Sequence, residues 1–336
     1  MNLNISINDL LDITDLVLEI PEYRESIEES ISTDNTTVIS VKNKYNFCDP
    51  KYEKSIFYNK PLSDFYLTIT ETTLDKIILT GQITEVYSNE YTKGEIVIKN
   101  DVINLDTVIT NDYVGYTLLD MMRFISIDYD IAINLSDIIC LRENEMKYLY
   151  TMRRNNDEQY KVINLLTDIS EALGIFIYLS NNEVRFKSYN PLDITSYYAN
   201  INLDDVLELK SKLDYDKIIN QYSVKYYLNA QNPIRDINLI GLDSRNINGE
   251  KPTKEIEASQ ENNFQIIEKS GAVNSGENYI NRYKDSIVIL DITLSDTWFW
   301  FLELCENYLI GDRAYQLITK SLNIAGSKCN CEFWSY

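Results

Sequence analysis

The sequence contains no histidine, and this absence removes several kinds of active site. A Ser-His-Asp triad, a Cys-His pair and an imidazole metal site all depend on a ring that titrates near neutral pH and binds metals through nitrogen. The glycine-rich motifs that hold phosphate are also missing, because Gly94 and Gly115 stand alone and neither GxGxxG nor GKS/T occurs. We expect no histidine-dependent catalysis, no catalytic residue that the sequence singles out, and no cofactor.

Basic residues are scarce, with 31 Lys and Arg against 52 Asp and Glu, for a net charge of −21. Binding in a nucleic-acid groove needs clustered Lys and Arg against the phosphates, so the sequence disfavours that class of function. No run approaches the roughly 18 apolar residues of a membrane span, and no basic and apolar signal opens the chain. We expect a soluble protein that is not secreted.

Cysteine is too sparse and too unevenly spaced for a disulfide framework, which favours a reducing compartment. Two cysteines, Cys329 and Cys331, could in principle bind a soft metal. Side chains two apart on a strand face the same way, however, and no second pair lies nearby, so packing in a core is favoured and no metal site is predicted. The other cysteines are Cys48, Cys140 and Cys305.

Three acids, Asp128, Asp130 and Asp137, resemble a fragment of a calcium loop. The glycine and the terminal bidentate glutamate of such a loop are missing at the required offsets. We therefore favour a solvated acidic loop over a calcium site.

The clearest local pattern lies between Asn155 and Ser188. Apolar residues at helical spacing predict a helix from Val162 to Leu173, with Asn155 or Asn156 as N-cap and Gly174 as the stop. Two strands with a tight turn at residues 180–182 then predict a hairpin. The helical face consists of Val162, Leu165, Leu166, Ile169 and Leu173.

A weaker version of this unit lies about fifty residues upstream. The spacing of Val114, Leu118, Met121 and Ile125 predicts a second helix, capped by Asn111 or Asp112 and followed by a short strand at 128–133. Either the two units are related, or they are two unrelated amphipathic helices, and the sequence leaves both open.

These patterns predict an α+β protein, mainly antiparallel β, in which two β-barrel-like domains flank a mixed helix-strand module. The first β-domain covers residues 1–108 and the mixed module covers 109–195, with a loop or short helix at 141–156. The second β-domain covers 196–336 and ends in a hairpin built from Tyr315–Ile324 and Lys328–Trp334. Residues 230–278, poor in hydrophobic clusters, are expected to form a long polar loop.

A dense aromatic group near the C-terminus is the one candidate contact surface that the sequence offers. Such residues usually fill a core or an interface, although they can also stack on a sugar ring. The group consists of Trp298, Phe299, Trp300 and Phe301.

Six segments, taken in order, resemble the hub proteins of phage tail tips and baseplates. The strand at 37–43 leads to a loop containing Phe47, and the strand at 78–83 has a central Gly81, as in that family. The segments are 12–28, 37–47, 78–83, the two helix-led units, 220–227 and 311–333. The resemblance covers most of the chain.

The resemblance implies a structural role without catalysis. Hub proteins of this kind form trimers, and their two β-barrels per chain make a pseudo-sixfold ring between the tail tube and a central spike or tip. The implied partners are further copies of the chain, the tail tube or distal tail protein, the spike or tip protein and the tape-measure protein. DNA would only pass through the channel. The implied location is the tail of a virion or phage-like particle assembled in the host cytoplasm.

Two other functions stay open on the residues alone. A tail adhesin would use the Tyr- and Trp-rich surface to hold a cell-wall glycan in a shallow aromatic groove. A glycoside hydrolase would place two carboxylates about 5–10 Å apart in a deep cleft, but 52 acidic residues offer no pair that stands out.

Overall fold

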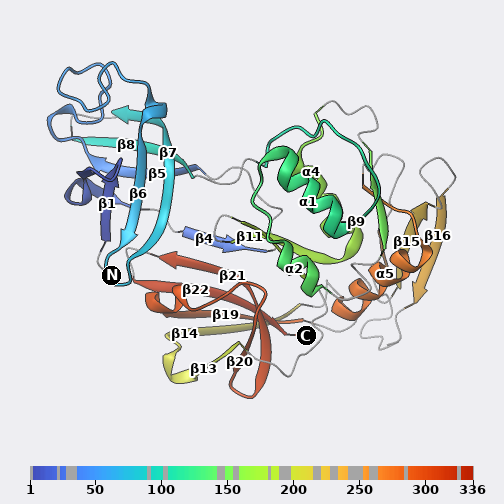
Figure 1. The fold of residues 1–336 in the computed structure, drawn as a ribbon. Coiled ribbons are helices and arrows are strands. Elements are labelled where there is room, and N and C mark those ends of the chain that lie inside the picture. Colours follow the sequence, from blue (N-terminus) through green and yellow to red (C-terminus); the bar gives the residue numbers. More distant parts are fainter. Residues whose placement is uncertain are drawn as a thin grey trace.

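The structure is a computed structural model of the chain, drawn in Figure 1. It contains two curled β-sheets and a helix-rich module beside them, so the expected α+β, mainly antiparallel β fold is confirmed. No helix in the described ranges is long and apolar enough to cross a membrane. The described residues are 3–20, 23–27, 36–88, 92–100, 105–141, 148–153, 159–180, 183–188, 198–214, 221–227, 234–240, 253–256, 264–283, 287–323 and 327–335.

The N-terminal sheet has seven strands in the order β2-β1-β6-β7-β8-β5-β3, and each neighbouring pair is antiparallel. Its alternating apolar residues turn inward, and the strands expected at 37–43 and 78–83 correspond to two of its strands, Thr36–Lys42 and Lys76–Ser88. The strands are β1 Leu3–Ile7, β2 Leu11–Asp12, β3 Val17–Glu19, β5 Thr36–Lys42, β6 Tyr66–Glu71, β7 Lys76–Ser88 and β8 Lys93–Asn100. Short 3-10 helices lie in the connections: η1 Thr14–Leu16, η2 Lys44–Asn46 and η3 Leu62–Asp64.

The C-terminal sheet has the strand order β13-β20-β21-β22-β19-β14. The hairpin predicted at 315–334 is confirmed as β21 and β22, and Gly311 makes the preceding turn with φ +64°. The strands are β13 Ala199–Ile201, β14 Glu208–Asp214, β19 Ile287–Ser295, β20 Asn307–Ile310, β21 Arg313–Asn323 and β22 Lys328–Ser335. The 3-10 helices are η4 Leu203–Asp205 and η5 Asp296–Trp300.

The two sheets are joined by an early segment of the chain. After β3 the chain leaves the N-terminal sheet and forms strand β4, Tyr23–Ser26, which pairs antiparallel with β21. In this pair Arg24 lies opposite Ser321. Figure 1 shows β4 between the two sheets. Buried apolar side chains of both sheets, from Ile39 and Leu67 to Leu317 and Phe333, form a single hydrophobic cluster. The two sheets therefore share one core.

The middle module has a second hydrophobic cluster of its own, around helix α4, Val162–Leu173. The predicted helical face is confirmed, because all five of its apolar side chains are buried. Gly174 ends the helix with φ +63°, and a Cβ there would come within 3.0 Å of the Tyr279 ring. The predicted hairpin follows as β11 Ile175–Ser180 and β12 Glu183–Ser188. The cap differs from the prediction: Lys161 is the N-cap, its N–H donating to Asn164 Oδ1 at 3.1 Å, while Asn155 and Asn156 lie outside the described residues.

The upstream unit differs from its prediction. Val114 lies in strand β9, Tyr113–Thr117, opposite Thr151 of β10, Leu149–Met152, because pairing with β10 extends that backbone. Helix α1 therefore begins only at Leu118, with the Thr117 hydroxyl accepting from the Asp120 N–H at 3.2 Å. The strand predicted at 128–133 is wrong: its first two residues belong to α1, Leu118–Tyr129, Asp130 is the C-cap, and Ile133 makes only an isolated bridge to Val184. A second helix, α2 Leu135–Cys140, follows.

The expectation of a long polar loop at 230–278 is wrong for the described residues. This stretch contains β16 Ile234–Ile240, β17 Thr253–Ile256, β18 Phe264–Ile266 and most of helix α5, Lys269–Tyr283. Strand β15, Gln221–Tyr227, pairs with β16 and β17, and β18 pairs with β10 of the middle module. Helix α5 likewise packs in the second cluster, so these residues of the predicted C-terminal domain belong with the middle module.

Helix α5 was missed because its sequence has two glycines and few apolar residues, which disfavours a helix on local grounds. Contacts with α4 stabilise it instead. Asn278 Nδ2 donates to the Leu173 carbonyl at 3.0 Å and the Tyr279 hydroxyl donates to the Glu171 carbonyl at 2.7 Å, while Ser275 donates to the Ala172 carbonyl. These side chains satisfy carbonyls that the end of α4 leaves open, which only the tertiary structure reveals.

Candidate functional site

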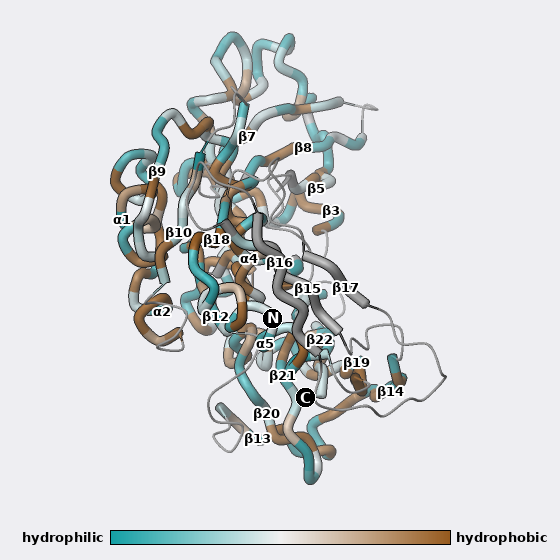
Figure 2. Tube along the Cα trace, turned by 90° about the vertical axis from the view of Figure 1, so that its right-hand side faces the viewer, coloured by the Kyte–Doolittle hydropathy of each residue, from teal (hydrophilic) through white to brown (hydrophobic). Residues whose placement is uncertain are grey.

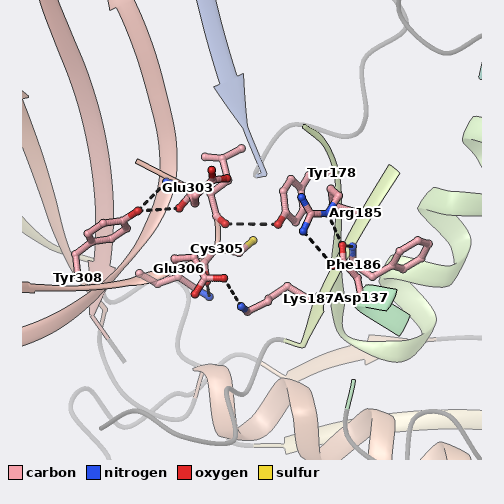
Figure 3. Close-up of polar contacts among 11 residues, drawn as sticks. Asp137, Tyr178, Arg185, Phe186, Lys187, Glu303, Cys305, Glu306 and Tyr308 are labelled. Carbon is pink, nitrogen blue, oxygen red and sulfur yellow. Dashed lines mark hydrogen bonds and ion pairs between the residues drawn. The ribbon is translucent and has the colours of Figure 1, made fainter. Parts of the chain in front are cut away.

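A polar contact fixes the middle module against the C-terminal sheet (Figure 3). Lys187 of β12 donates to Glu306 Oε1 at 2.6 Å, across 119 residues of sequence. The Tyr178 hydroxyl of β11 reaches the Leu304 carbonyl at 3.5 Å. Both side chains come from the predicted hairpin, whose strands β11 and β12 pair in an unbroken register from Ile175 opposite Ser188 to Ser180 opposite Glu183, so the two contacts attach the hairpin to the sheet at two points.

A second ion pair braces this hairpin from within the module. Arg185 donates to both oxygens of Asp137 on α2, at 2.5 and 3.0 Å, and the Phe186 N–H donates to the same carboxylate at 3.1 Å. The hydrogen bonds that Arg185 donates to Asp137 raise the pKa of Arg185, which therefore stays charged. Bidentate pairs of this kind fix direction as well as distance. The contact fixes β12 to α2 through the Asp137 carboxylate (Figure 3).

The sheet side of the contact is equally ordered. Cys305 has φ +63°, its N–H donates to the Leu317 carbonyl at 2.9 Å, and its own carbonyl accepts from Gln316 Nε2 at 3.1 Å. The Tyr308 hydroxyl accepts from the Glu303 N–H at 2.7 Å. These bonds to β20 and β21 fix the segment between η5 and β20, which carries Leu304 and Glu306.

The chemistry of this contact is structural. Burial raises the pKa of the Cys305 thiol far above its ordinary value, so the sulfur stays protonated and is a poor nucleophile. Burial also raises the pKa of Cys48, in the turn after η2, to about 12. The charged groups at the contact are each engaged by a partner of opposite charge, which suits positioning rather than proton transfer.

The candidate contact residues Trp298, Phe299, Trp300 and Phe301 lie in and just after η5, beside the C-terminal sheet. Phe299 is buried and meets Trp300 edge-on at 5.3 Å between ring centroids. Trp298 and Trp300 are half-buried against the shared core, and only Phe301 is largely exposed, at 62%. The four rings therefore form no continuous platform for a sugar, and Phe301 alone is open to a partner.

A buried lysine holds this aromatic segment in place. Lys320 of β21 donates to the Leu302 carbonyl at 2.8 Å and the Phe299 carbonyl at 3.3 Å, and its Nζ lies 4.5 Å from the Phe299 ring centroid. An ammonium over a ring face is attracted by the ring quadrupole, more strongly where water is excluded. The segment after η5 is thus fixed to the sheet.

The three acids that resemble a calcium loop are not brought together around one point. Asp128 accepts from the Tyr113 hydroxyl at 2.8 Å, whereas Asp137 is engaged by Arg185 as described above. Asp130 is the C-cap of α1, with φ +52°. Among the described residues, no group of three or more cysteines and acids is placed to hold a metal.

The two cysteines at the end of the chain are both buried on β22, their sulfurs 3.4 Å apart, and both line the shared core. This is the packing role that the alternation of Cys329 and Cys331 predicted.

Strand β14 is a surface feature that the sequence analysis missed. Six of its seven residues are exposed, on both faces of the strand, and Leu209 and Leu213 are open at 47% and 52%. Its pattern of leucines alternating with charges is also that of a half-buried strand, so no local signal marks it. Only its position at the end of the strand order distinguishes it.

Comparison with known proteins bears on the fold. No protein-family model matches the sequence, and no curated protein matches it. Among solved structures, the chain is similar to a 43 kDa tail protein of prophage MuSo2 from Shewanella oneidensis, with a TM-score of 0.61 at 12% identity. That match covers 99% of this chain and 98% of the other.

Two further solved structures are similar over nearly their whole length. A tail protein from Neisseria meningitidis matches with a TM-score of 0.60 at 8% identity, covering 100% of this chain and 97% of the other. A prophage tail protein from Listeria monocytogenes matches with a TM-score of 0.51 at 10% identity, covering 99% and 94%. The chain therefore has the fold of phage tail proteins, and the resemblance that the sequence indicated is confirmed at that level.

Proposed function

We propose that this chain is a structural hub or adaptor subunit of a phage or phage-like tail, linking the tail tube to the central spike or tip. The observation that carries the proposal is a match to tail proteins over 99% of the chain, by a fold with two curled sheets around one shared core. Such a body suits a load-bearing subunit, because the two sheets cannot turn independently without opening that core.

The proposal extends to a homotrimer. Each chain supplies two sheets of comparable size, so three copies supply six, which can meet a sixfold tube on one side and a threefold tip on the other. A repeated head-to-tail contact between identical subunits forms a closed ring when the rotation from copy to copy closes. The neighbours proposed on this basis are the tube or distal tail protein, the spike or tip protein and the tape-measure protein, within a tail assembled in the host cytoplasm.

The net charge supports a ring whose channel passes DNA without holding it. Three copies of −21 carry −63 together, and this charge must lie on water-facing surface because buried unpaired carboxylates are too costly. A channel lined with carboxylates repels phosphate, and only groups within about 8 Å of the DNA count at physiological salt. We expect acids to dominate the channel wall and Lys and Arg to lie mainly at contacts between subunits.

The mass of the assembled protein tests the proposal. Static light scattering of the purified 39.2 kDa chain should give three times the chain mass, and in a mixture with the tube protein of the same particle it should give the mass of three chains plus that of the bound tube protein. Negative-stain electron microscopy of the same sample should show rings. A strict monomer at high concentration, with no ring in isolated particles either, would remove the proposal.

A further inference from the structure

Strand β14 forms an open margin of the C-terminal sheet. It pairs with β19 on one side only, and within the described part of the chain no strand pairs with its other side. Figure 1 shows it on the side of the sheet opposite to β21 and β4, away from the N-terminal sheet. An exposed edge of this length offers unpaired backbone groups to another chain, and proteins ordinarily cover or shorten such edges.

The core face of the sheet continues onto this margin. Leu209 lies opposite Ile292, and Leu213 opposite Val288, in the register of β14 on β19. Ile292 is buried in the shared core, whereas the two leucines are about half exposed. Leu207, just before the strand, is 57% exposed. An apolar face that extends beyond the part of a sheet that other elements cover is typical of a contact site.

The middle of β14 is basic on a strongly acidic chain. Lys210 and Lys212 are exposed, and neither makes an ion pair with another described residue. The two acids of the strand lie at its ends, and Glu208 is 3.7 Å from the Lys328 Nζ. A partner that covers this strand should therefore combine apolar side chains with negative charge.

The chain itself carries such a surface at the tip of the β1–β2 hairpin. Leu10 is 90% exposed there and Leu11 is partly exposed, between the exposed acids Asp9 and Asp12. The Thr14 hydroxyl and N–H hold the pKa of the Asp12 carboxyl below its usual range, so it is charged at neutral pH. No Lys or Arg precedes Arg24 in the sequence.

These two surfaces lie at the ends of the two-sheet body. Strand β2 is a terminal strand of the N-terminal sheet and β14 is a terminal strand of the C-terminal sheet. The other end of the N-terminal sheet, β3, leads within four residues to β4, which pairs into the C-terminal sheet. The β3 end of the N-terminal sheet is thus already tied to the C-terminal sheet within the chain, whereas the terminal strands β2, β13 and β14 are not.

We propose that β14 of one copy docks on the β1–β2 tip of the next copy. Leu209 and Leu213 cover Leu10 and Leu11, and the two lysines face Asp9 and Asp12 of the neighbour. The contact joins two different surfaces, so it repeats from copy to copy and closes into a ring when the rotation allows. This inference rests on the proposed function, since it names the contact by which the ring would form.

A charge exchange tests the contact. The variants K210E/K212E and D9K/D12K should each weaken self-association at least about tenfold at low salt, because like charges then face each other. A chain that carries all four substitutions should regain most of the association. Sedimentation velocity over a concentration series measures each constant, and circular dichroism confirms that each variant is folded.

The control variant K51E/K54E makes the same change of charge at two exposed lysines of the connection between η2 and η3, which belong to neither surface, and should associate as the parent chain does. Rings that form equally well from K210E/K212E would overturn this inference and leave the hub proposal standing. Restoration by the four-fold variant cannot arise from a general effect of charge, so its failure would also overturn the contact. A parent chain that stays monomeric alone and with its tube protein, and that forms no ring in isolated particles, would overturn both.

Discussion

Strands β22 and β14 have the same kind of sequence and opposite surroundings. In β22 the alternate residues Cys329, Cys331 and Phe333 are all buried, and in β14 the alternate residues Leu209 and Leu213 stand half exposed. Strand β22 lies between β21 and β19, whereas β14 has only β19 beside it. Figure 2 shows β14 at the outer margin of the molecule, next to β19. The position of a strand in the sheet, and not its local sequence pattern, decides whether its alternate apolar side chains are buried in the core or stay exposed for a partner.

The largest difference between these strands should appear in stability. Phe333→Ala removes a fully buried ring that meets Tyr308 edge-on at 5.7 Å, and should lower the free energy of unfolding by about 3–5 kcal/mol. In the dissociated chain, Leu213→Ala should lower it by less than about 0.5 kcal/mol, because about half of that side chain is already exposed there. Urea unfolding at one protein concentration measures both. Equal losses would show that β14 is covered within the monomer.

The next test compares a fully buried leucine with a half-buried one in the second hydrophobic cluster, around α4. Leu166→Ala in α4 leaves a cavity among fully buried neighbours and should cost about 2–5 kcal/mol. Leu119 of α1, which is only half-buried, gives a matched control that should cost less on substitution by alanine. A loss below roughly 0.5 kcal/mol for Leu166→Ala in the same urea melts would mean that the α4 face is not the centre of the module.

The sequence predicted those elements whose signals are local. Helix α4 has a regular apolar face and a glycine stop, and the β21–β22 hairpin has strict alternation, so each could be placed within a few residues. Helix α5 and β9 could not be placed. The first depends on donating side chains to the end of α4, and the second on pairing with β10, and both contacts join residues far apart in the chain.

The site was less predictable than the fold. The aromatic group was found because its residues are adjacent, yet its burial differs from ring to ring and leaves only Phe301 open. The Lys187–Glu306 contact unites residues 119 apart, and neither carries a local signal. The exposure of β14 is a property of where the sheet ends, which periodicity cannot show. Pairing order along a sheet is the information that the single sequence lacks.

A smaller effect, the pH dependence of stability, should distinguish a buried carboxylate from an exposed one. Burial raises the pKa of Asp168 to about 6, with the Tyr160 hydroxyl at 2.5 Å partly opposing that shift. The folded state therefore binds this proton more tightly than the unfolded state, and ionisation lowers stability as pH rises from about 4 through about 6. Asp168→Asn removes that loss, so the variant should gain on the parent chain between pH 5 and pH 7.5.

Asp12→Asn is the control for this pH effect. The pKa of Asp12 is lowered from 3.8, so its charge is constant over that window and the variant should track the parent chain. Urea unfolding of all three proteins at both pH values gives the comparison. A difference between Asp168→Asn and the parent chain that does not change with pH would contradict the assigned burial.

The smallest expected effect belongs to the ion pair that joins the module to the sheet. Lys187 and Glu306 are each about one-third exposed, so water screens them and a double-mutant cycle with Lys187→Met and Glu306→Gln should give a coupling of about 0–1 kcal/mol. The pair then sets geometry more than stability. A coupling above about 2 kcal/mol would show that the ion pair is as strong as a buried interaction. The proposed difference in energy between the core and this contact would then be wrong.

The most direct test of the hub proposal is a cryo-electron microscopy map of the tail particle that contains this chain. The account predicts a threefold ring in which N-terminal and C-terminal sheets alternate six times around the channel, with β14 of each copy against the β1–β2 tip of the next. A map in which the chain is a single copy at the periphery, or in which its two sheets do not line the channel, would contradict it.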